Sequence, residues 1–218
     1  MRIIAEEIRK TARVETHRVE LTGLGVTETI QEYAQEVDDY VSDLKLKPAD
    51  RLDFVTFSFG TLVARWWVEQ MGGRAHTMIS VCAPHHGTTK GSKLQFIPSL
   101  QQMQPGSPDI RTLYRSRRRD VRYHSIRLDE DGTLRPPCSS VLDGAANYVL
   151  HGKAHMAGPY RQVVRELIRD IYLGKAAPSG PQKLTPEQLV ELKLAPGRAA
   201  PAGDGGSLPS ARRPAENP

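Results

Sequence analysis

Residues 51–67 read Arg-Leu-Asp-Phe-Val-Thr-Phe-Ser-Phe-Gly-Thr-Leu-Val-Ala-Arg-Trp-Trp, and this stretch decides the fold that the sequence predicts. Its first half is a short apolar run with aromatic and β-branched residues, which is typical of a buried strand. From Leu62 onward, apolar residues recur at helical spacing. The turn between them is very short, with Ser58 at its apex and Gly60 two residues later. Such a turn places the Ser58 hydroxyl at the end of the sheet, beside the free N–H groups of a helix N-terminus.

The segment Thr56-Phe57-Ser58-Phe59-Gly60 fits a nucleophile elbow, whose pattern is G-x-S-x-G. The second glycine of the pattern is present, and a threonine stands in place of the first. The same segment also fits a serine that caps an ordinary helix, which is a common role for serine. Taken alone, the stretch leaves both interpretations open.

Elsewhere in the sequence, strand-like and helix-like periods alternate. The predicted strands cover residues 14–21, 52–57, 75–81, 121–128 and 147–150. Helices are expected over residues 2–12, 30–44 and 59–71, after the capping-box patterns Thr29/Glu32 and Ser99/Gln102, from Ser107, and from Pro159 to Ile171. This alternation predicts an α/β fold with a mostly parallel, doubly wound sheet that helices cover on both faces.

The length and composition indicate one α/β domain with an appendage. The chain has 218 residues, of which 39% are hydrophobic. After Leu173 the sequence turns to Ala, Pro, Gly and Ser, and no long apolar period returns. We therefore expect a folded domain over residues 1–173 and a disordered tail over residues 174–218, apart from a short helix that Thr185 caps and Pro186 begins.

The charge and cysteine content limit the partners that the sequence predicts. The formal net charge is +5, and the only dense basic run, residues 111–122 with six arginines, fits a solvated loop better than a nucleic-acid site. Cys82 and Cys138 are expected to be free thiols, and no four-ligand zinc spacing occurs, so we expect no cofactor and no metal.

The sequence also contains no signal for a membrane. We find no run of about 18 apolar residues, so no integral membrane segment is expected. The N-terminal residues 2–12 form an amphipathic helix pattern rather than a signal peptide. A cytoplasmic location is therefore the default expectation, which would change if the true start of the protein lies upstream.

Two downstream residues suit the chemistry that a serine nucleophile needs. A serine hydroxyl requires a base that takes its proton and a carboxylate that orients the base. In elbow-containing sheets these partners follow in the order Ser, Asp or Glu, His. Asp131 ends a predicted strand, and His155 lies in the loop after the next strand. Asp131 also fits an ordinary Asp-Gly turn, and Asp129 and Glu130 are neighbouring candidates for the acid.

On these residues the chain resembles an α/β-hydrolase of the lipase and esterase type, and in particular the class 2 lipases. Residues 83–88, Ala-Pro-His-His-Gly-Thr, are similar to the T-P-H-x-G-T segment of that family. Residues 131–136 resemble its D-G-x-V-x-P segment, and residues 152–156 resemble its G-x-x-H-L segment. Residues 102–107 also resemble a segment of these lipases, and the similarity covers roughly residues 15–173.

The resemblance implies a role for each matching residue. Ser58 would be the nucleophile, His155 the base, Asp131 the acid, and the Phe59 N–H an oxyanion donor. The resemblance also implies a set of residues that shape the substrate pocket: His85, His86 and Gly87. A metal role for the two histidines together with Cys82 is an alternative.

The sequence departs from the family in two respects. Thr56, Phe57 and Thr61 replace residues that are usually Gly, His and Gly. The family's first strands, which carry a second oxyanion donor, have no counterpart, so the expected fold is an N-terminally truncated α/β-hydrolase. Because an oxyanion donor contributes about 3–4 kcal/mol, we expect this chain to be a weak or inactive catalyst.

The function that the resemblance implies is hydrolysis of carboxylic esters. The substrate would be a small-molecule or lipid acyl ester, cleaved through the triad of Ser58, His155 and Asp131. One alternative is a truncated or degenerate relative that acts as a binding or scaffold protein. Another is an acyltransferase or thioesterase with the same triad.

Overall fold

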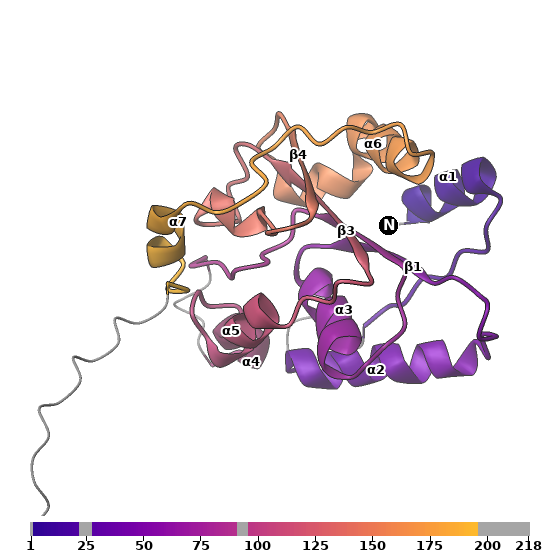
Figure 1. The fold of residues 1–218 in the computed structure, drawn as a ribbon, viewed down its shortest axis with the longest axis horizontal. Coiled ribbons are helices and arrows are strands. Elements are labelled where there is room, and N and C mark those ends of the chain that lie inside the picture. Colours follow the sequence, from indigo (N-terminus) through magenta and orange to yellow (C-terminus); the bar gives the residue numbers. More distant parts are fainter. Residues whose placement is uncertain (1, 22–27, 91–95, 196–218) are drawn as a thin grey trace, which may run out of the picture.

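The computed structural model describes residues 2–21, 28–90 and 96–195. Its centre is a four-stranded, fully parallel sheet with the strand order β1-β2-β3-β4. Helices lie on both faces of this sheet, as Figure 1 shows. The α/β class and the parallel sheet predicted from the alternating sequence periods are confirmed.

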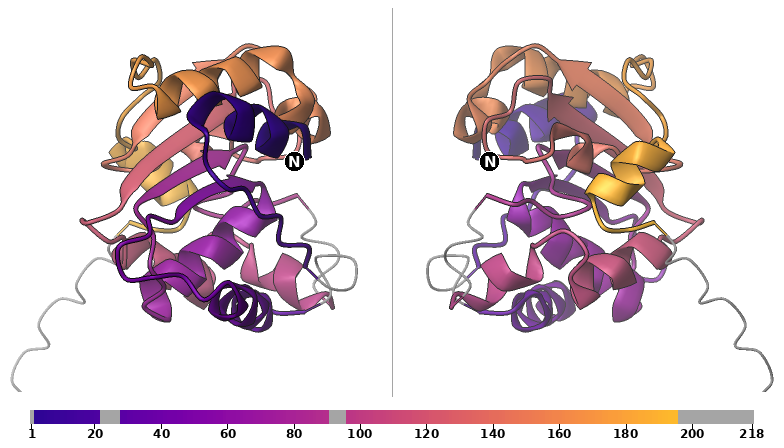
Figure 2. Two further views of the ribbon diagram at one scale, coloured as in Figure 1. Left: turned by 90° about the vertical axis from the view of Figure 1, so that its right-hand side faces the viewer. Right: turned by 90° about the vertical axis from the view of Figure 1, so that its left-hand side faces the viewer.

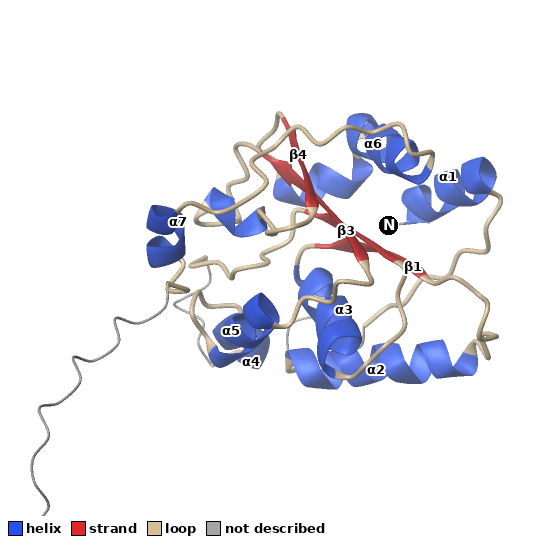
Figure 3. Ribbon diagram, in the orientation of Figure 1, coloured by secondary structure: helices blue, strands red, loops and turns tan. Residues whose placement is uncertain are grey.

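The four strands are short and in register. They are β1 (Asp53–Phe57), β2 (Thr77–Val81), β3 (Arg122–Leu128) and β4 (Ala146–Leu150). Phe57 pairs with Val81, Val81 with Ile126, and Leu128 with Leu150. Because the strands point the same way, the residues that follow them meet at one edge of the sheet, shown in red in Figure 3.

One face of the sheet carries the larger hydrophobic core. The helices on this face are α2 (Ile30–Asp43), α3 (Phe59–Gln70), α4 (Pro98–Gln102) and α5 (Pro108–Arg115), which lie together in Figure 2. The expected capping box of Thr29 and Glu32 begins α2. Side chains of α2 and α3 such as Tyr33 and Leu62 are fully buried between these helices and the sheet.

The opposite face is covered by α1 (Arg2–Ala12), α6 (Gln162–Tyr172) and the short 3₁₀ helix η2 (His155–Tyr160). Ile4 and Ile8 of α1 and Ile168 of α6 belong to a second core cluster that packs on the strands. A further 3₁₀ helix, η1 (Pro137–Ser140), precedes β4. None of the helices in the part of the chain that the structure describes is long and apolar enough to cross a membrane.

The segment 14–21, which alternates like a strand, is not one. Val19 and Leu21 pack against the larger core, so the alternation reflects side-chain packing. Its residues belong to no ladder of the sheet, and a strand requires a paired neighbour. The loop expected at residues 22–25 lies outside the described residues.

Two predicted helix starts also differ from the structure. Ile97 is the N-cap of α4, so Ser99 and Gln102 form no capping box. Instead, the Gln102 side chain accepts a hydrogen bond of 2.7 Å from the Ile30 N–H and satisfies the start of α2. Pro159 lies inside η2, and α6 begins three residues later. Local patterns cannot reveal the role of Gln102, because its partners Ile30 and Gln31 lie 72 and 71 residues away in sequence, on another helix.

Residues 174–195, expected to be disordered, are packed against the domain. Leu184, Leu192 and Leu194 are buried in the larger core, and α7 (Pro186–Glu191) forms with the predicted Thr185 cap. The Ser179 and Gly180 N–H groups donate to the Asn147 carbonyl of β4. Three irregularly spaced leucines produce no sequence period, yet each finds a place in the core. Residues 196–218 lie outside the described residues.

Candidate active site

Ser58 occupies a strained turn between β1 and α3. Its backbone angles are φ 50° and ψ −128°, a conformation that few residues other than glycine adopt. The Ser58 N–H donates to the Val81 carbonyl at 2.9 Å, and the Ser58 carbonyl accepts from the Thr61 N–H at 3.0 Å. These bonds hold the turn from both sides. Phe59 is the first residue of α3, so its N–H has no acceptor within the helix.

The side chains of Ser58, His155 and Asp131 form a continuous hydrogen-bonded chain. His155 Nε2 lies 2.9 Å from Ser58 Oγ, and His155 Nδ1 lies 2.7 Å from Asp131 Oδ2. Because an ionised carboxylate only accepts, Nδ1 carries the proton and Nε2 keeps its lone pair for the serine hydroxyl. This is the tautomer that a general base needs.

The Asp131 carboxylate is buried but well supplied with donors. Its side chain is 1% exposed, and burial alone would raise its pKa. Hydrogen bonds from His155 and from the backbone N–H groups of Thr133 and Leu134 outweigh this effect and lower the pKa of Asp131 below its usual value. The carboxylate is therefore ionised at neutral pH and fixed in orientation.

The neighbouring acids make other contacts. Asp129 pairs with His151 at 3.0 Å, and this bond together with the Gly152 N–H lowers the pKa of Asp129 to about 2. Glu130 pairs with Lys153 at 2.9 Å. Both ion pairs lie on the exposed surface of the loops after β3 and β4. Of the three candidate acids, Asp131 is the one that contacts His155.

Two residues that the sequence did not place at the triad lie beside this hydrogen-bonded chain. The Phe57 ring lies 5.1 Å from the His155 ring, centroid to centroid, and packs against it at 39°. Cys82, the residue after β2, is fully buried with its sulfur close to Asp131 and His155. Burial and the nearby carboxylate raise the pKa of Cys82 to about 12, so its thiol keeps its proton. Their positions in sequence were the signal: Phe57 is the last residue of β1, and Cys82 directly follows β2.

The two threonines that replace glycines at the elbow bond to each other. Thr56 Oγ1 lies 2.8 Å from Thr61 Oγ1, and both residues are buried. Each hydroxyl thereby gains a partner across the start of α3. Gly60 keeps a negative φ, and a Cβ placed there meets nothing within 4 Å. The elbow of this chain is therefore closed by a threonine pair rather than by close glycine packing.

The pocket residues proposed from the resemblance lie in the interior. His85 Nε2 contacts the hydroxyls of Ser80 and Ser125 at 3.0 and 3.2 Å. His86 Nε2 lies 2.7 Å from the Val141 carbonyl. These bonds hold the loop after β2 against the sheet. Their role in shaping a substrate pocket stays a prediction.

Position 87 requires a glycine. Its φ is +86°, and a Cβ there would lie 2.6 Å from the Met103 carbonyl oxygen. Only glycine fits this close approach of the loop to residues 103–105.

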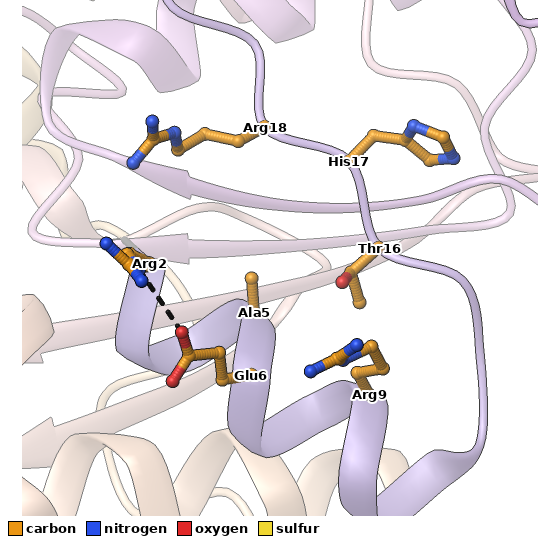
Figure 4. Close-up of a pocket in the computed structure, with 7 residues that line it drawn as sticks. All are labelled: Arg2, Ala5, Glu6, Arg9, Thr16, His17 and Arg18. Carbon is orange, nitrogen blue, oxygen red and sulfur yellow. Dashed lines mark hydrogen bonds and ion pairs between the residues drawn. The ribbon is translucent and has the colours of Figure 1, made fainter.

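A cavity in the described part of the molecule is separate from Ser58. It has a volume of about 350 Å³ and lies between α1 and the segment 16–18, as Figure 4 shows. Two of its three arginines form ion pairs on the surface: Arg2 pairs with Glu6 at 3.2 Å, and Arg18 pairs with Glu20 at 2.7 Å. Because Ser58 does not line it, this cavity is not the acyl-binding pocket of the site.

A parallel sheet, a strained serine at a strand-to-helix turn and a hydrogen-bonded Ser-His-Asp chain define an α/β-hydrolase of the lipase and esterase type. Within this class, the chain belongs to the palmitoyl protein thioesterase family, whose model matches residues 1–127. The matched region contains Ser58 and ends before Asp131 and His155. A search of curated proteins gives no match.

Solved structures with the same fold include lipolytic enzymes. A structure from a study of LipS and LipT, two metagenome-derived lipolytic enzymes, has a TM-score of 0.55 at 15% identity, covering 79% of this chain and 85% of that one. The lin2722 product of Listeria innocua has a TM-score of 0.51 at 17% identity, covering 68% of both chains. Phospholipase PlaB of Legionella pneumophila has a TM-score of 0.47 at 15% identity. The match covers 59% of this chain and 36% of PlaB. At such identities the likeness to the first two structures concerns the fold alone.

Proposed function

We propose that this protein is a serine hydrolase that releases acyl groups from esters or thioesters, with Ser58 as the nucleophile. The observation that carries the proposal is the unbroken hydrogen-bonded chain from Ser58 through His155 to Asp131. The strained backbone at Ser58 adds support, because such strain persists where the surrounding structure enforces it and is frequent at functional sites.

In this mechanism Ser58 Oγ attacks the acyl carbonyl carbon while His155 Nε2 takes the hydroxyl proton. Asp131 stabilises the imidazolium that results. The Phe59 N–H, free at the start of α3, donates to the developing oxyanion. His155 then gives its proton to the leaving alcohol or thiol, and an acyl-enzyme remains. Water attacks the acyl-enzyme with His155 again as the base, and the acid product leaves Ser58.

Thioesters are the substrate class that the family and the chemistry favour within this proposal. A thiol leaving group, with a pKa of about 8.5, needs far less proton donation than an alcohol. Phe59 offers the one oxyanion donor that we can assign in the described residues, and a missing donor costs about 3–4 kcal/mol of transition-state stabilisation. We therefore expect acyl thioesters to be cleaved faster than alkyl esters of the same acyl group, whose hydrolysis should be weak.

The test combines active-site labelling with substrate comparison. The purified chain and Ser58→Ala are treated with a fluorophosphonate, which phosphonylates an activated serine. We expect labelling of the parent chain and none of Ser58→Ala. Hydrolysis of a short acyl thioester, a nitrophenyl ester and an alkyl ester is then measured for both proteins.

Two results would contradict the proposal in different ways. Absence of labelling in a folded parent chain would favour a binding or scaffold role instead. Labelling without hydrolysis, but with acyl transfer to an added alcohol or amine, would favour the acyltransferase alternative. Fast alkyl-ester turnover that depends on Ser58 would show that a second oxyanion donor exists.

A further inference from the structure

Three different kinds of metal-ligand atom lie close together beside Ser58, and they come from Cys82, Asp131 and His155. The thiol sulfur, a carboxylate oxygen and a ring nitrogen all lie within 4.8 Å of one another. They come from three separate segments: the loop after β2, the loop after β3, and η2. The Cys82 side chain is fully buried, and those of Asp131 and His155 are 1% and 4% exposed.

We propose that this cluster is an inhibitory binding site for a thiophilic divalent cation of the Zn²⁺ or Cd²⁺ class. Thiolate, imidazole and carboxylate are the ligands that Zn²⁺ prefers, at about 2.0–2.3 Å. Binding itself needs only the geometry described above. The consequence for catalysis rests on the proposed function of Ser58.

The charges of the complex balance. Cys82 releases its thiol proton to solvent when it binds, Asp131 is already ionised, and His155 binds as a neutral ring. One dication then meets one thiolate and one carboxylate, so the occupied site carries no net charge. Burial of a neutral complex avoids the large desolvation cost of an unpaired ion.

Occupancy would remove the base that Ser58 needs. The nitrogen of His155 that faces Asp131 is Nδ1, which carries the proton in the metal-free state. A metal on Nδ1 requires the proton to move to Nε2. The lone pair that would accept the Ser58 proton is then lost, and the carboxylate is drawn to the metal. The cation therefore inhibits by fixing the wrong tautomer, without blocking the serine itself.

A cation would have to enter past the turn that covers the thiol. Gly158 of η2 sits directly on Cys82, because a Cβ at Gly158 would lie 3.1 Å from Cys82 Sγ. The neighbouring Met156 and Tyr160 are 72% and 59% exposed, so η2 forms an outer layer over the cluster. Short 3₁₀ segments are less stable than α-helices, so local opening of residues 156–160 would let a cation reach the thiol, while His155 at the start of η2 stays in place to bind it.

A second cluster near the same end of the sheet complicates simple binding measurements. Asp129, Glu130 and His151 also bring three donor atoms within 4.8 Å, but on the exposed surface and without a thiol. A measurement that reports thiolate coordination separates the two clusters. The ultraviolet charge-transfer band of Cd²⁺-thiolate complexes is such a signal.

The experiment titrates Cd²⁺ into the full chain and records this band. Cys138 is the only other cysteine, so Cys138→Ser is the matched control for Cys82→Ser. We expect saturation at one equivalent in the parent chain and in Cys138→Ser, and no band in Cys82→Ser or Cys82→Ala. His155→Gln should weaken Cd²⁺ binding at least tenfold, since it removes one of the three ligands. Circular dichroism verifies that each variant is folded.

The proposal is overturned if the parent chain gives no band, if the band depends on Cys138, or if His155→Gln binds Cd²⁺ equally well. Fluorophosphonate labelling of Ser58 with Cd²⁺ and after addition of a chelator tests the inhibition. Loss of labelling that the chelator reverses supports it, and unchanged labelling overturns it. A Cys82-dependent band in a chain that is never labelled supports the metal site while rejecting the proposed hydrolase function.

Discussion

The Asp131 carboxylate accepts hydrogen bonds from His155 and from two backbone N–H groups, and these bonds have two tasks. The bond to His155 Nδ1 sets the tautomer of the ring, and the bonds from the Thr133 and Leu134 N–H groups fix the carboxylate. The Asp129 carboxylate, two residues earlier, bonds to the His151 ring instead. The two aspartates are thus a natural pair for testing which acid acts on His155.

Asp131→Asn is expected to slow the labelling of Ser58 by a fluorophosphonate by about 10⁴-fold, because an amide facing Nδ1 favours the wrong histidine tautomer. Asp129→Asn should label at a rate close to that of the parent chain. The second-order rate constant of labelling is the measurement. Equal losses from the two variants, or a loss confined to Asp129→Asn, would reverse the assignment of the acid.

The threonine pair at the elbow gives a second prediction at this scale. Thr56→Val leaves the buried Thr61 hydroxyl without its partner, and we expect the free energy of unfolding to fall by about 1–3 kcal/mol. Thr61→Val should cost less, because the Thr56 hydroxyl keeps the Ile79 carbonyl as an acceptor at 3.5 Å. The double variant removes both polar groups and should be close to neutral. Denaturant unfolding of the four proteins measures the coupling, and additive losses would show that the hydroxyls do not depend on each other.

At the scale of the element, α3 does more than present Ser58. Arg65 and Glu69, one helical turn apart, form a fully buried two-pronged ion pair at 2.8 and 3.0 Å. Arg65 also donates to the Leu113 carbonyl of α5 at 2.6 Å, and Glu69 accepts from the Tyr123 hydroxyl of β3 at 3.0 Å. The helix that begins at Ser58 is therefore fixed to its neighbours by charged groups in the core.

Glu69→Gln is expected to destabilise the protein by about 3–5 kcal/mol, because it leaves the buried Arg65 charge uncompensated. Replacing both residues with apolar ones, as in Arg65→Met with Glu69→Leu, should cost much less. Thermal or denaturant unfolding distinguishes the two. If the double variant is as unstable as Glu69→Gln, the pair contributes net stability rather than only avoiding an unpaired charge.

At the scale of the whole molecule, two buried histidines join the loop after β2 to the core. Desolvation and the positive charge of Arg65 lower the pKa of His86 to about 3 and that of His85 well below its usual value. Both rings are neutral in the folded protein. In the unfolded chain their pKa returns to about 6.5, so the unfolded state binds more protons in between.

Stability is therefore expected to be intact above pH 6.5 and to fall as the pH drops from 6.5 towards 3. Each histidine contributes about 1.4 kcal/mol of loss per pH unit within this window. His86→Gln keeps a donor for the Val141 carbonyl and should reduce this slope between pH 6.5 and 5.5. The measurement is the free energy of unfolding against pH for both proteins. An unchanged slope would mean that the His86 ring is not the group that takes up the proton.

The packed segment 174–195 is part of the folded domain, and this gives another prediction about the whole molecule. We expect a chain that ends at Leu173 to be markedly less stable, because it exposes the core beneath Leu184, Leu192 and Leu194. Leu192→Ala should cost about 2–5 kcal/mol, whereas Val190→Ala, at a site that is 66% exposed, should cost little. A chain that ends at Ala195 should keep the stability of the full chain. If the chain that ends at Leu173 is as stable as the full chain, residues 174–195 contribute nothing to stability and the expectation of a tail outside the domain is correct.

The sequence by itself determined the features that local periods and motif order encode. Strand and helix periods predicted the four parallel strands and the helices on both faces. The order of Ser58, Asp131 and His155 predicted which three side chains meet, because the carboxyl ends of parallel strands share one edge of the sheet. The resemblance of residues 131–136 and 152–156 to segments of the lipase family selected the particular Asp and His.

Only the tertiary structure decided the features that depend on contacts between distant segments. The placement of Cys82 beside Asp131, the bond between Thr56 and Thr61, and the burial of Arg65 leave no period in the sequence. The segment 14–21 alternates like a strand but has no partner, and the leucines of residues 174–195 lack a period but are buried. In each case packing against residues far away in sequence decides the outcome, and local propensity is too weak to oppose it.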